Sequence, residues 1–113
     1  MKKTIALIIL ALASFITASS PSAQEFKAPI KFVVPFAPGG ATDVLARMLA
    51  PKMSAELGQS IIIENRAGAS GQIGTQFVKN SPADGTVFLV NTDSSLTILP
   101  HIVADVPYLP SRD

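Results

Sequence analysis

Two glycine-containing segments hold the residues of this chain that are best suited to binding chemistry. Residues 38–42 (PGGAT) and 68–71 (GASG) are mostly small, which lets a ligand approach their backbone amides closely. Each segment also precedes a predicted helix, whose first-turn N–H groups lack an intrahelical partner and carry the positive end of the helix dipole. A third segment, residues 91–95 (NTDSS), adds hydroxyl and carboxylate groups. The expected guest is an anion such as a carboxylate or a phosphate, although the same glycines also suit tight turns.

Residues 68–74 also raise the question of a dinucleotide site. Gly68, Gly71 and Gly74 follow a predicted strand, but their spacing is G-x-x-G-x-x-G. The close glycine pair that forms the pyrophosphate turn is therefore missing, and the chain contains no G-x-x-x-x-G-K-[ST] motif. The sequence does not favour a nucleotide enzyme.

Side chains suited to catalysis are sparse. Ser70 lacks the glycine two positions later that a G-x-S-x-G elbow needs, because position 72 is Gln. The single histidine, His101, is more typical of a surface or structural residue than of a base. Asp43 is a conceivable general base, but its place at the start of a predicted helix favours an N-cap role. With no cysteine and one histidine, the sequence predicts no metal site, no cofactor and no enzyme.

The composition narrows the class of protein and of partner. Hydrophobic residues make up 48% and charged residues 15%, which excludes disorder for the bulk of the chain. Nine Lys and Arg residues against eight Asp and Glu give a net charge of +1. This balance is unsuited to phosphate backbones, so no nucleic acid partner is expected.

The elements that must position these segments alternate between strands and helices. Short apolar runs rich in β-branched residues, at 30–34, 61–63 and 87–90, predict strands. Helical patterns at 44–57 and 73–79 separate them, and this order is typical of an α/β fold with a parallel sheet. Loops that leave the carboxyl ends of such strands share one edge, where ligands bind. We therefore expect the three segments to meet at that edge.

The longer predicted helix carries its own boundary signals. Thr42 and Asp43 are its N-cap candidates, and Gly58 supplies a stop. Large apolar residues recur at spacings of one, three and four and predict one apolar face. These residues are Val44, Leu45, Met48, Leu49, Met53 and Leu57. The tail at 99–113 contains three prolines, which predicts a connector rather than a long helix.

Residues 1–23 are predicted to be a cleaved secretory signal peptide. Lys2 and Lys3 precede an apolar run at 4–18, which is shorter than the roughly 20 residues needed to span a bilayer. The alternative is a permanent N-terminal anchor. We expect an exported, periplasmic mature chain that begins near residue 24.

The mature chain contains three distinctive motifs, in the order VVPFAPGGATDVLAR, ENRAGASGQIGT and SPADGT. With these motifs, residues 29–113 strongly resemble the N-terminal part of the Bug-type solute-binding proteins, the extracytoplasmic receptors of tripartite tricarboxylate transporters. The closing YLPSRD resembles the stretch that precedes the family's crossing to its second lobe. The resemblance implies that residues 24–113 form part of the first lobe of a two-lobed, periplasmic-binding-protein-like fold.

The resemblance also implies a function and a binding site. Members of the family capture a small organic carboxylate and deliver it to membrane transporter subunits, without catalysis of their own. For this chain we expect a small organic carboxylate or an amino acid as the ligand, and a monomer. Their first lobe holds the ligand carboxylate through backbone amides and ordered waters of the strand-end loops. By position, the implied ligand-binding residues are Pro38, Gly39, Gly40, Ala41, Thr42, Asp43, Ala69, Ser70 and Gly71, with Asp93 and Ser94 matching less firmly.

The length departs from the family pattern, because family members are more than twice as long. We therefore expect a fragment that lacks the second lobe, and a small incomplete domain is marginally stable. Alone it should bind its ligand weakly or not at all, because half of the cleft and the hinge closure are missing. Three alternatives remain at this point. They are an exported α/β hydrolase-like enzyme, a membrane-anchored partner-binding stub and a non-functional fragment.

Overall fold

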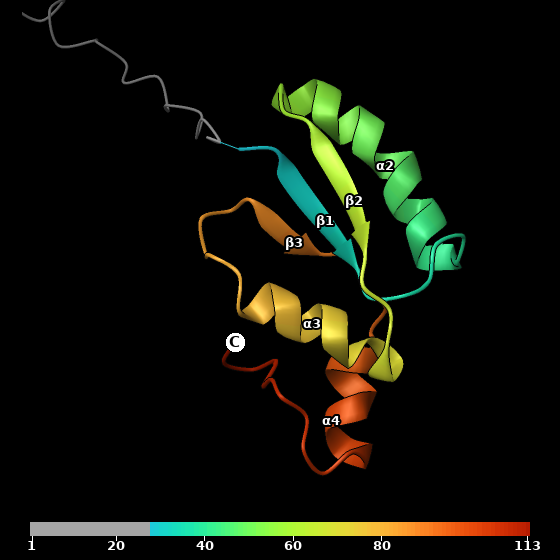
Figure 1. The fold of residues 1–113 in the computed structure, drawn as a ribbon, viewed down its shortest axis with the longest axis vertical. Coiled ribbons are helices and arrows are strands. Elements are labelled where there is room, and N and C mark those ends of the chain that lie inside the picture. Colours follow the sequence, from blue (N-terminus) through green and yellow to red (C-terminus); the bar gives the residue numbers. More distant parts are fainter. Residues whose placement is uncertain (1–27) are drawn as a thin grey trace, which may run out of the picture.

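The computed structural model describes residues 28–113 (Figure 1). The predicted signal peptide, residues 1–23, and the predicted start of the mature chain at 24 lie outside the described residues. Within residues 28–113, no helix combines the length and the apolar character needed to cross a membrane.

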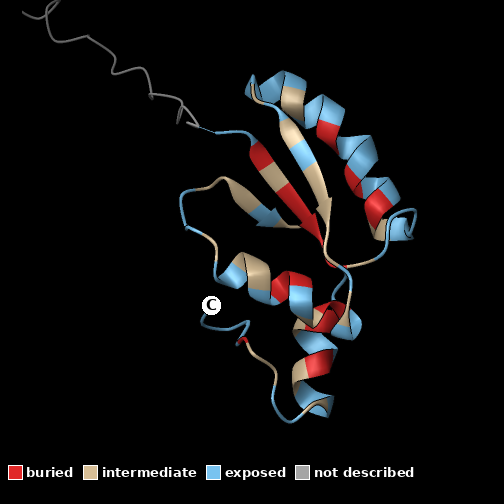
Figure 2. Cartoon of the chain, in the orientation of Figure 1, coloured by how far each residue is buried: buried red, intermediate tan, exposed pale blue. Residues whose placement is uncertain are grey.

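The fold is built on a parallel sheet of three strands, as predicted for an α/β protein. The strands are β1 (Ile30–Val34), β2 (Ile61–Asn65) and β3 (Val87–Leu89), in the order β2-β1-β3. Ile30 pairs with Ile61, and Lys31 pairs with Val87. β1 lies in the centre and is the most deeply buried strand, with Val33 and Val34 fully inaccessible to solvent (Figure 2). Its β-branched residues therefore fill both faces of the sheet, as expected of a central parallel strand.

Two helices connect these strands and lie on opposite faces of the sheet (Figure 1). α2 (Ala41–Leu57) joins β1 to β2, and α3 (Gln72–Lys79) joins β2 to β3. The two crossovers run in opposite directions along the sheet, so right-handed connections place their helices on opposite sides. Two neighbouring side chains of β2 point to opposite faces of the sheet, one toward each helix. Glu64 pairs with Lys31, which lies over the Phe77 ring of α3, whereas Asn65 bonds to Asp43 of α2.

The face of α2 that packs on the sheet is not the predicted apolar face. The buried residues of the helix are Asp43, Ala46 and Ala50, at spacings of three and four. The large apolar residues that periodicity singles out (Val44, Leu45, Met48, Leu49, Met53 and Leu57) are all exposed, from 38% to 67%. α2 carries apolar residues around most of its circumference, and the small side chains let the helix backbone come closest to the sheet.

Of the two predictions for the ends of α2, the one for its start is wrong and the one for its end is confirmed. Gly40 is the N-cap, with an extended backbone at φ −72° and ψ 165°, and no side chain caps the helix. The N-cap prediction was therefore wrong, because Thr42 and Asp43 both lie in the first turn. At the other end Gly58 adopts φ +64°, and its N–H bonds to the carbonyl of Ser54. This left-handed cap confirms the predicted stop.

The segment after β3 contains more helix than the prolines predict. A π-helical turn, η2 (Ser94–Ile98), continues into the short α4 (Leu99–Ile102), and residues 103–113 run on without a helix or a strand. Tyr108 anchors this stretch, because it is 3% exposed and its hydroxyl donates to the carbonyl of Ser95 at 2.6 Å. The connector prediction is confirmed only beyond Ile102.

Candidate functional site

The loops that follow the three strands pack against one another at the carboxyl edge of the sheet. We call them loop 1 (residues 35–40), loop 2 (residues 66–71) and loop 3 (residues 90–95). Gly71 shows where they meet: a Cβ there would lie 3.3 Å from Oγ of Ser95 and 3.6 Å from Cβ of Pro35. One residue from each loop thus shares a single contact point, as the parallel topology requires.

Gly74, in the first turn of α3, tightens the contact between loops 1 and 2. A Cβ at this position would lie 2.7 Å from Cβ of Pro35, 2.9 Å from its Cα and 3.0 Å from the carbonyl oxygen of Arg66. No side chain fits in this space. The glycine therefore lets the start of α3 press directly on the start of loop 1.

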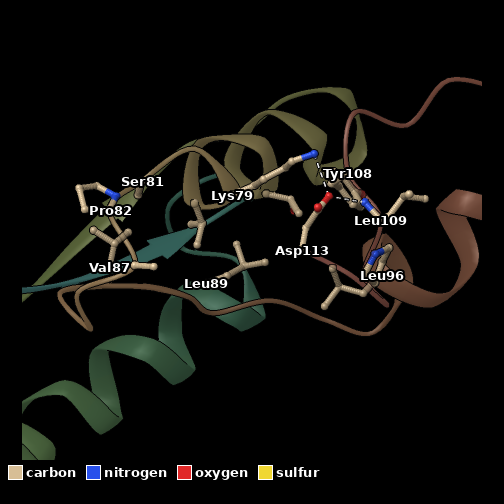
Figure 3. Close-up of a pocket in the computed structure, with 13 residues that line it drawn as sticks. Lys79, Ser81, Pro82, Val87, Leu89, Leu96, Tyr108, Leu109 and Asp113 are labelled. Carbon is tan, nitrogen blue, oxygen red and sulfur yellow. Dashed lines mark hydrogen bonds and ion pairs between the residues drawn. The ribbon is translucent and has the colours of Figure 1, made fainter.

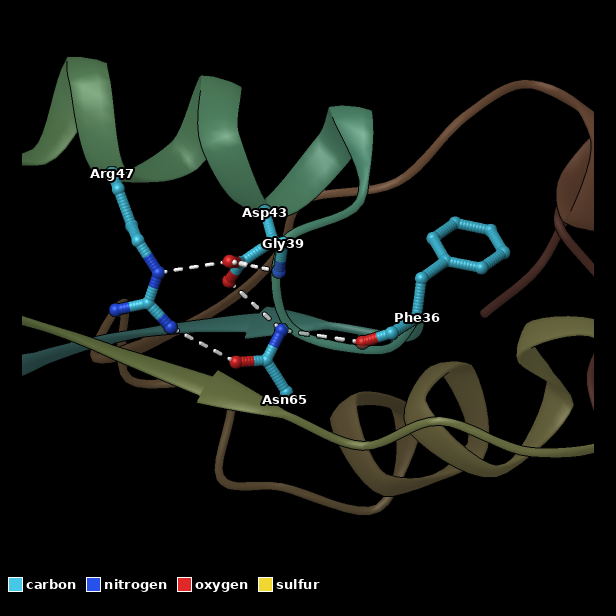
Figure 4. A network of polar contacts seen from close by, with 5 residues as sticks. All are labelled: Phe36, Gly39, Asp43, Arg47 and Asn65. Atoms are coloured by element: carbon cyan, nitrogen blue, oxygen red, sulfur yellow. Dashed lines mark hydrogen bonds and ion pairs between the residues drawn. The ribbon is translucent and has the colours of Figure 1, made fainter.

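Asp43 is the centre of a polar network that holds loop 1 (Figure 4). Its Oδ2 accepts hydrogen bonds from the backbone N–H of Gly39 at 2.8 Å and from Nε of Arg47 at 2.9 Å. Its Oδ1 accepts one from Nδ2 of Asn65 at 2.9 Å. The same Nδ2 donates to the carbonyl of Phe36 at 3.2 Å, and Nη2 of Arg47 donates to Oδ1 of Asn65 at 3.1 Å. Loop 1, α2 and the end of β2 are thereby joined.

These contacts determine the charge of Asp43. The Arg47 guanidinium, the Gly39 amide and the Asn65 amide hold the pKa of the carboxyl well below its usual range, although burial opposes them. The group is therefore an anion at neutral pH, and Arg47 neutralises it. A carboxylate with so low a pKa and with both oxygens engaged is a poor general base, so the geometry favours an anchoring role.

The network also determines which amides of loop 1 are available. The Gly39 amide bonds to Asp43, and the Gly40 amide donates to the carbonyl of Ala37 at 3.3 Å. The first complete helical bond of α2 runs from Val44 N–H to the Gly40 carbonyl. The amides of Ala41, Thr42 and Asp43 therefore remain as donors without an intrahelical partner. Of the predicted residues 38–43, these three retain a backbone N–H that can bind an anion.

Loop 2 has a run of left-handed backbone. Gly68 and Gly71 adopt φ +137° and +92°, and between them Ala69 and Ser70 adopt +46° and +56° as part of the short η1 turn (Ala69–Gly71). Ala69 and Ser70 are exposed, and Gly71 is buried at the contact point of the three loops. Among the contacts of the described residues, the Ser70 hydroxyl makes no hydrogen bond, and His101 is exposed on α4. Nothing in this geometry activates Ser70 as a nucleophile.

In loop 3, Ser95 lies at the contact point rather than the predicted Asp93 and Ser94. The carbonyl of Asp93 accepts the N–H groups of Leu96 and Thr97, and the Ser94 hydroxyl pairs with that of Thr92. Ser95 is fully buried, and its Oγ accepts a hydrogen bond from Asn91 at 2.5 Å.

Three residues of this site, Arg47, Asn65 and Ser95, were not predicted from the sequence. Arg47 carries a usable signal, because it follows the Asp43 carboxylate by four positions on a predicted helix. Asn65 carries one usable signal, because it is the first polar uncharged residue after a run of β-branched residues. Ser95 carries none, since nothing in the sequence distinguishes it from Ser94.

A separate hollow of about 370 Å³ lies between α3, β3 and the tail (Figure 3). Its walls are mostly apolar, and Nζ of Lys79 pairs with Oδ2 of Asp113 at 2.8 Å on its rim. It is lined by Thr75, Val78, Lys79, Ser81, Pro82, Ala83, Val87, Leu89, Leu96, Tyr108, Leu109, Pro110 and Asp113. None of the predicted ligand-binding residues lines it, so its size does not make it the candidate site. Residues 28–113 also contain no group of three His, Asp or Glu side chains placed to hold a metal ion.

The chain is similar to a known family of receptors. Residues 45–113 match the family described as "Tripartite tricarboxylate transporter family receptor" (TctC). Among characterised sequences, Protein BugT of Bordetella pertussis is 40% identical over 110 residues, which is 96% of this chain and 34% of BugT. The chain spans about a third of the length of the curated relatives it matches.

Solved structures give the same picture. MatC from Rhodopseudomonas palustris, with bound malate, superposes with a TM-score of 0.71 at 33% identity, over 74% of this chain and 29% of MatC. A second R. palustris protein, solved with adipate, gives 0.68 at 36% identity, over 77% of this chain and 29% of its own. The α/β arrangement of this chain, with its parallel sheet, is therefore part of a fold found in periplasmic binding proteins.

Proposed function

This chain belongs to the family of tripartite tricarboxylate transporter receptors, of the Bug type, and we propose that it captures a small organic carboxylate at the edge formed by loops 1, 2 and 3. One observation carries the proposal. The three strand-end loops converge on Gly71, and loop 1 leads directly into α2, whose first-turn amides of Ala41, Thr42 and Asp43 have no intrahelical partner. Two proteins similar in sequence and fold hold malate and adipate, which are dicarboxylates.

The place of this capture is the periplasm, and the recipient of the ligand is a set of membrane transporter subunits. Membership of a periplasmic receptor family supports both parts of the proposal. The receptor acts as a monomer, after removal of residues 1–23. Of the residues 38–43 named in the sequence, we assign the binding of the anion to the backbone amides of Ala41, Thr42 and Asp43, because those of Gly39 and Gly40 are already bonded. The residues of the other two loops stay as the sequence predicts them, and the anion is held by backbone amides rather than by a Lys or an Arg.

The alternative of an exported hydrolase is not favoured. The described contacts give Ser70 no base, and the low pKa of Asp43 deprives that residue of basic strength at neutral pH. Relatives in the family are solute-binding proteins, which need no chemical step.

A single substitution tests the anion-binding edge with little disturbance of the fold. Ala41→Pro deletes the N–H of the first residue of α2, a position where proline is well tolerated because that N–H has no intrahelical partner. The preceding residue, Gly40, already has the extended backbone that proline demands. Ala41→Ser keeps the N–H and is the matched control.

Isothermal titration calorimetry with malate, adipate, citrate and amino acids measures the outcome on the full chain. We expect at least one carboxylate to bind, and Ala41→Pro to weaken it by about 10-fold or more, since a hydrogen bond to a charged group contributes roughly 1.5–3 kcal/mol. The serine variant should bind like the original chain. Absence of binding to every acid at millimolar concentration would contradict the proposal.

A further inference from the structure

The Asp43 carboxylate is unsuited to contact a ligand directly. It is 2% exposed, and its two oxygens already accept from Gly39, Arg47 and Asn65 at 2.8–2.9 Å. A carboxylate with this set of donors stabilises the groups that surround it. Any effect of the Asp43 side chain on binding must therefore pass through those groups.

The donors that surround Asp43 come from three separate parts of the fold. Gly39 belongs to loop 1, Arg47 lies one turn further along α2, and Asn65 ends β2. Asn65 also reaches back to the Phe36 carbonyl, so loop 1 is held near both of its ends (Figure 4). Gly39 has φ +82°, a left-handed conformation that directs its N–H toward the carboxylate. The shape of loop 1 therefore depends on this network.

The network also removes an electrostatic obstacle to anion binding. A buried negative charge in the first turn of α2 would repel an incoming carboxylate. Here the Arg47 guanidinium compensates it at 2.9 Å, and a second nitrogen of the same group bonds to Asn65. The first turn of α2 is thus left with its free amides and with no uncompensated anion.

We propose that Asp43 is a positioning residue, whose carboxylate holds loop 1 in the shape that presents the amides of Ala41 and Thr42 to a ligand carboxylate. This inference rests on the proposed function. Without the anchor, loop 1 would have to be ordered at the moment of binding, and the cost of that ordering would reduce affinity.

The primary variant is Asp43→Asn, which keeps the size of the side chain. It replaces one acceptor oxygen by an NH₂ group, which must then face at least one of the surrounding donors. The control is Glu64→Gln, one residue before Asn65. Glu64 is also a partly buried, ion-paired carboxylate, but it faces α3 through Lys31 and Arg66. The control therefore removes a comparable charge on the opposite face of the sheet.

Two readouts on the full chain separate positioning from general stability. Calorimetry with malate should show that Asp43→Asn weakens binding on the order of 10-fold, whereas Glu64→Gln stays within twofold of the original chain. Amide NMR should show the Gly39 proton shifted upfield and exchanging faster in Asp43→Asn only, because it loses its charged acceptor. Equal malate affinity in Asp43→Asn, or an unchanged Gly39 amide, would overturn the inference.

The second readout keeps the inference distinct from the proposed function. If the original chain binds no carboxylate, the proposed function fails, and the amide signals of Gly39, Ala41 and Thr42 in Asp43→Asn still decide whether Asp43 positions loop 1. If Asp43→Asn does not fold, Arg47→Gln replaces it, since that side chain is half exposed. Arg47→Lys should recover most of the lost affinity by restoring the charge, and a lysine variant no better than the glutamine variant would count against the inference.

Discussion

At Gly74 the backbone of Pro35 and of Arg66 leaves no room for a side chain, so the packing of loops 1 and 2 depends on this glycine. Gly74→Ala would place a methyl group 2.7 Å from Cβ of Pro35 and 3.0 Å from the Arg66 carbonyl. We expect a loss of about 1–3 kcal/mol in the free energy of unfolding, which is the usual cost of overpacking. Gln76→Ala, at an exposed position of the same helix, should stay within about 0.5 kcal/mol. Urea denaturation compares the two, and an equal effect would refute the close approach.

The low pKa of Asp43 predicts a definite dependence of stability on pH. Its folded-state pKa lies below the ordinary value of 3.8, so the native contacts favour the ionised form. That contribution is complete above the unfolded pKa and is lost as pH falls through 3.8 toward the folded value. Asp113, whose pKa Lys79 and the Leu109 amide lower to about 2, acts in the same direction.

The corresponding measurement is the urea midpoint at pH 7 and at pH 3. We expect Asp43→Asn to reduce the difference between the two midpoints, because the variant has no carboxyl group to titrate at this position. Gln76→Ala, at an exposed position of α3 and without a titratable group, is the control and should leave the difference unchanged. A difference as large in Asp43→Asn as in the original chain would show that the carboxylate is not anchored in solution.

At the scale of elements, α2 is unusual because its small side chains are buried and its large apolar side chains are exposed. Its small residues face the sheet, with Ala46 fully buried, whereas Leu45 is 53% exposed. We therefore expect Ala46→Leu to cost about 1–3 kcal/mol of unfolding free energy. Leu45→Ala should change it by no more than about 0.5 kcal/mol, since it alters an exposed position. Chemical denaturation measures both, and the opposite ranking would place the predicted apolar face against the sheet.

This reversal marks the limit of prediction from periodicity. The strands could be predicted because runs of β-branched residues, such as those at 30–34, are typical of buried β-strands. The helix was found as well, but hydrophobic periodicity weighs large side chains and gives little weight to alanine. Which stripe faces a sheet depends on how closely the backbones approach, and that depends on the partner surface. The Gly58 stop was predictable because a left-handed cap is a local matter.

The candidate site was only partly predictable for a related reason. The glycine-rich loops stand out in the sequence, and the topology of a parallel sheet brings them to one edge. Asn65 and Ser95 act through contacts with residues far away in sequence, Asp43 and Gly71, so the local sequence gives only one signal for Asn65 and none for Ser95. The sequence also gives no sign that the Gly39 N–H points to the Asp43 carboxylate. That hydrogen bond leaves one amide fewer for a ligand.

At the scale of the whole molecule, the central place of β1 has a consequence for folding kinetics. β1 is the first strand of the described residues, yet Ile30 pairs with Ile61, 31 positions later, and Lys31 pairs with Val87, 56 positions later. Closing the shorter loop costs less chain entropy, so the β1–α2–β2 unit should form before β3 adds to it. In stopped-flow refolding, Ile63→Ala in β2 should slow folding, whereas Leu89→Ala in β3 should mainly speed unfolding. β1 would thus pair with β2 early and with β3 only later. In the interval one edge of β1 would be unpaired and could add a strand from another chain.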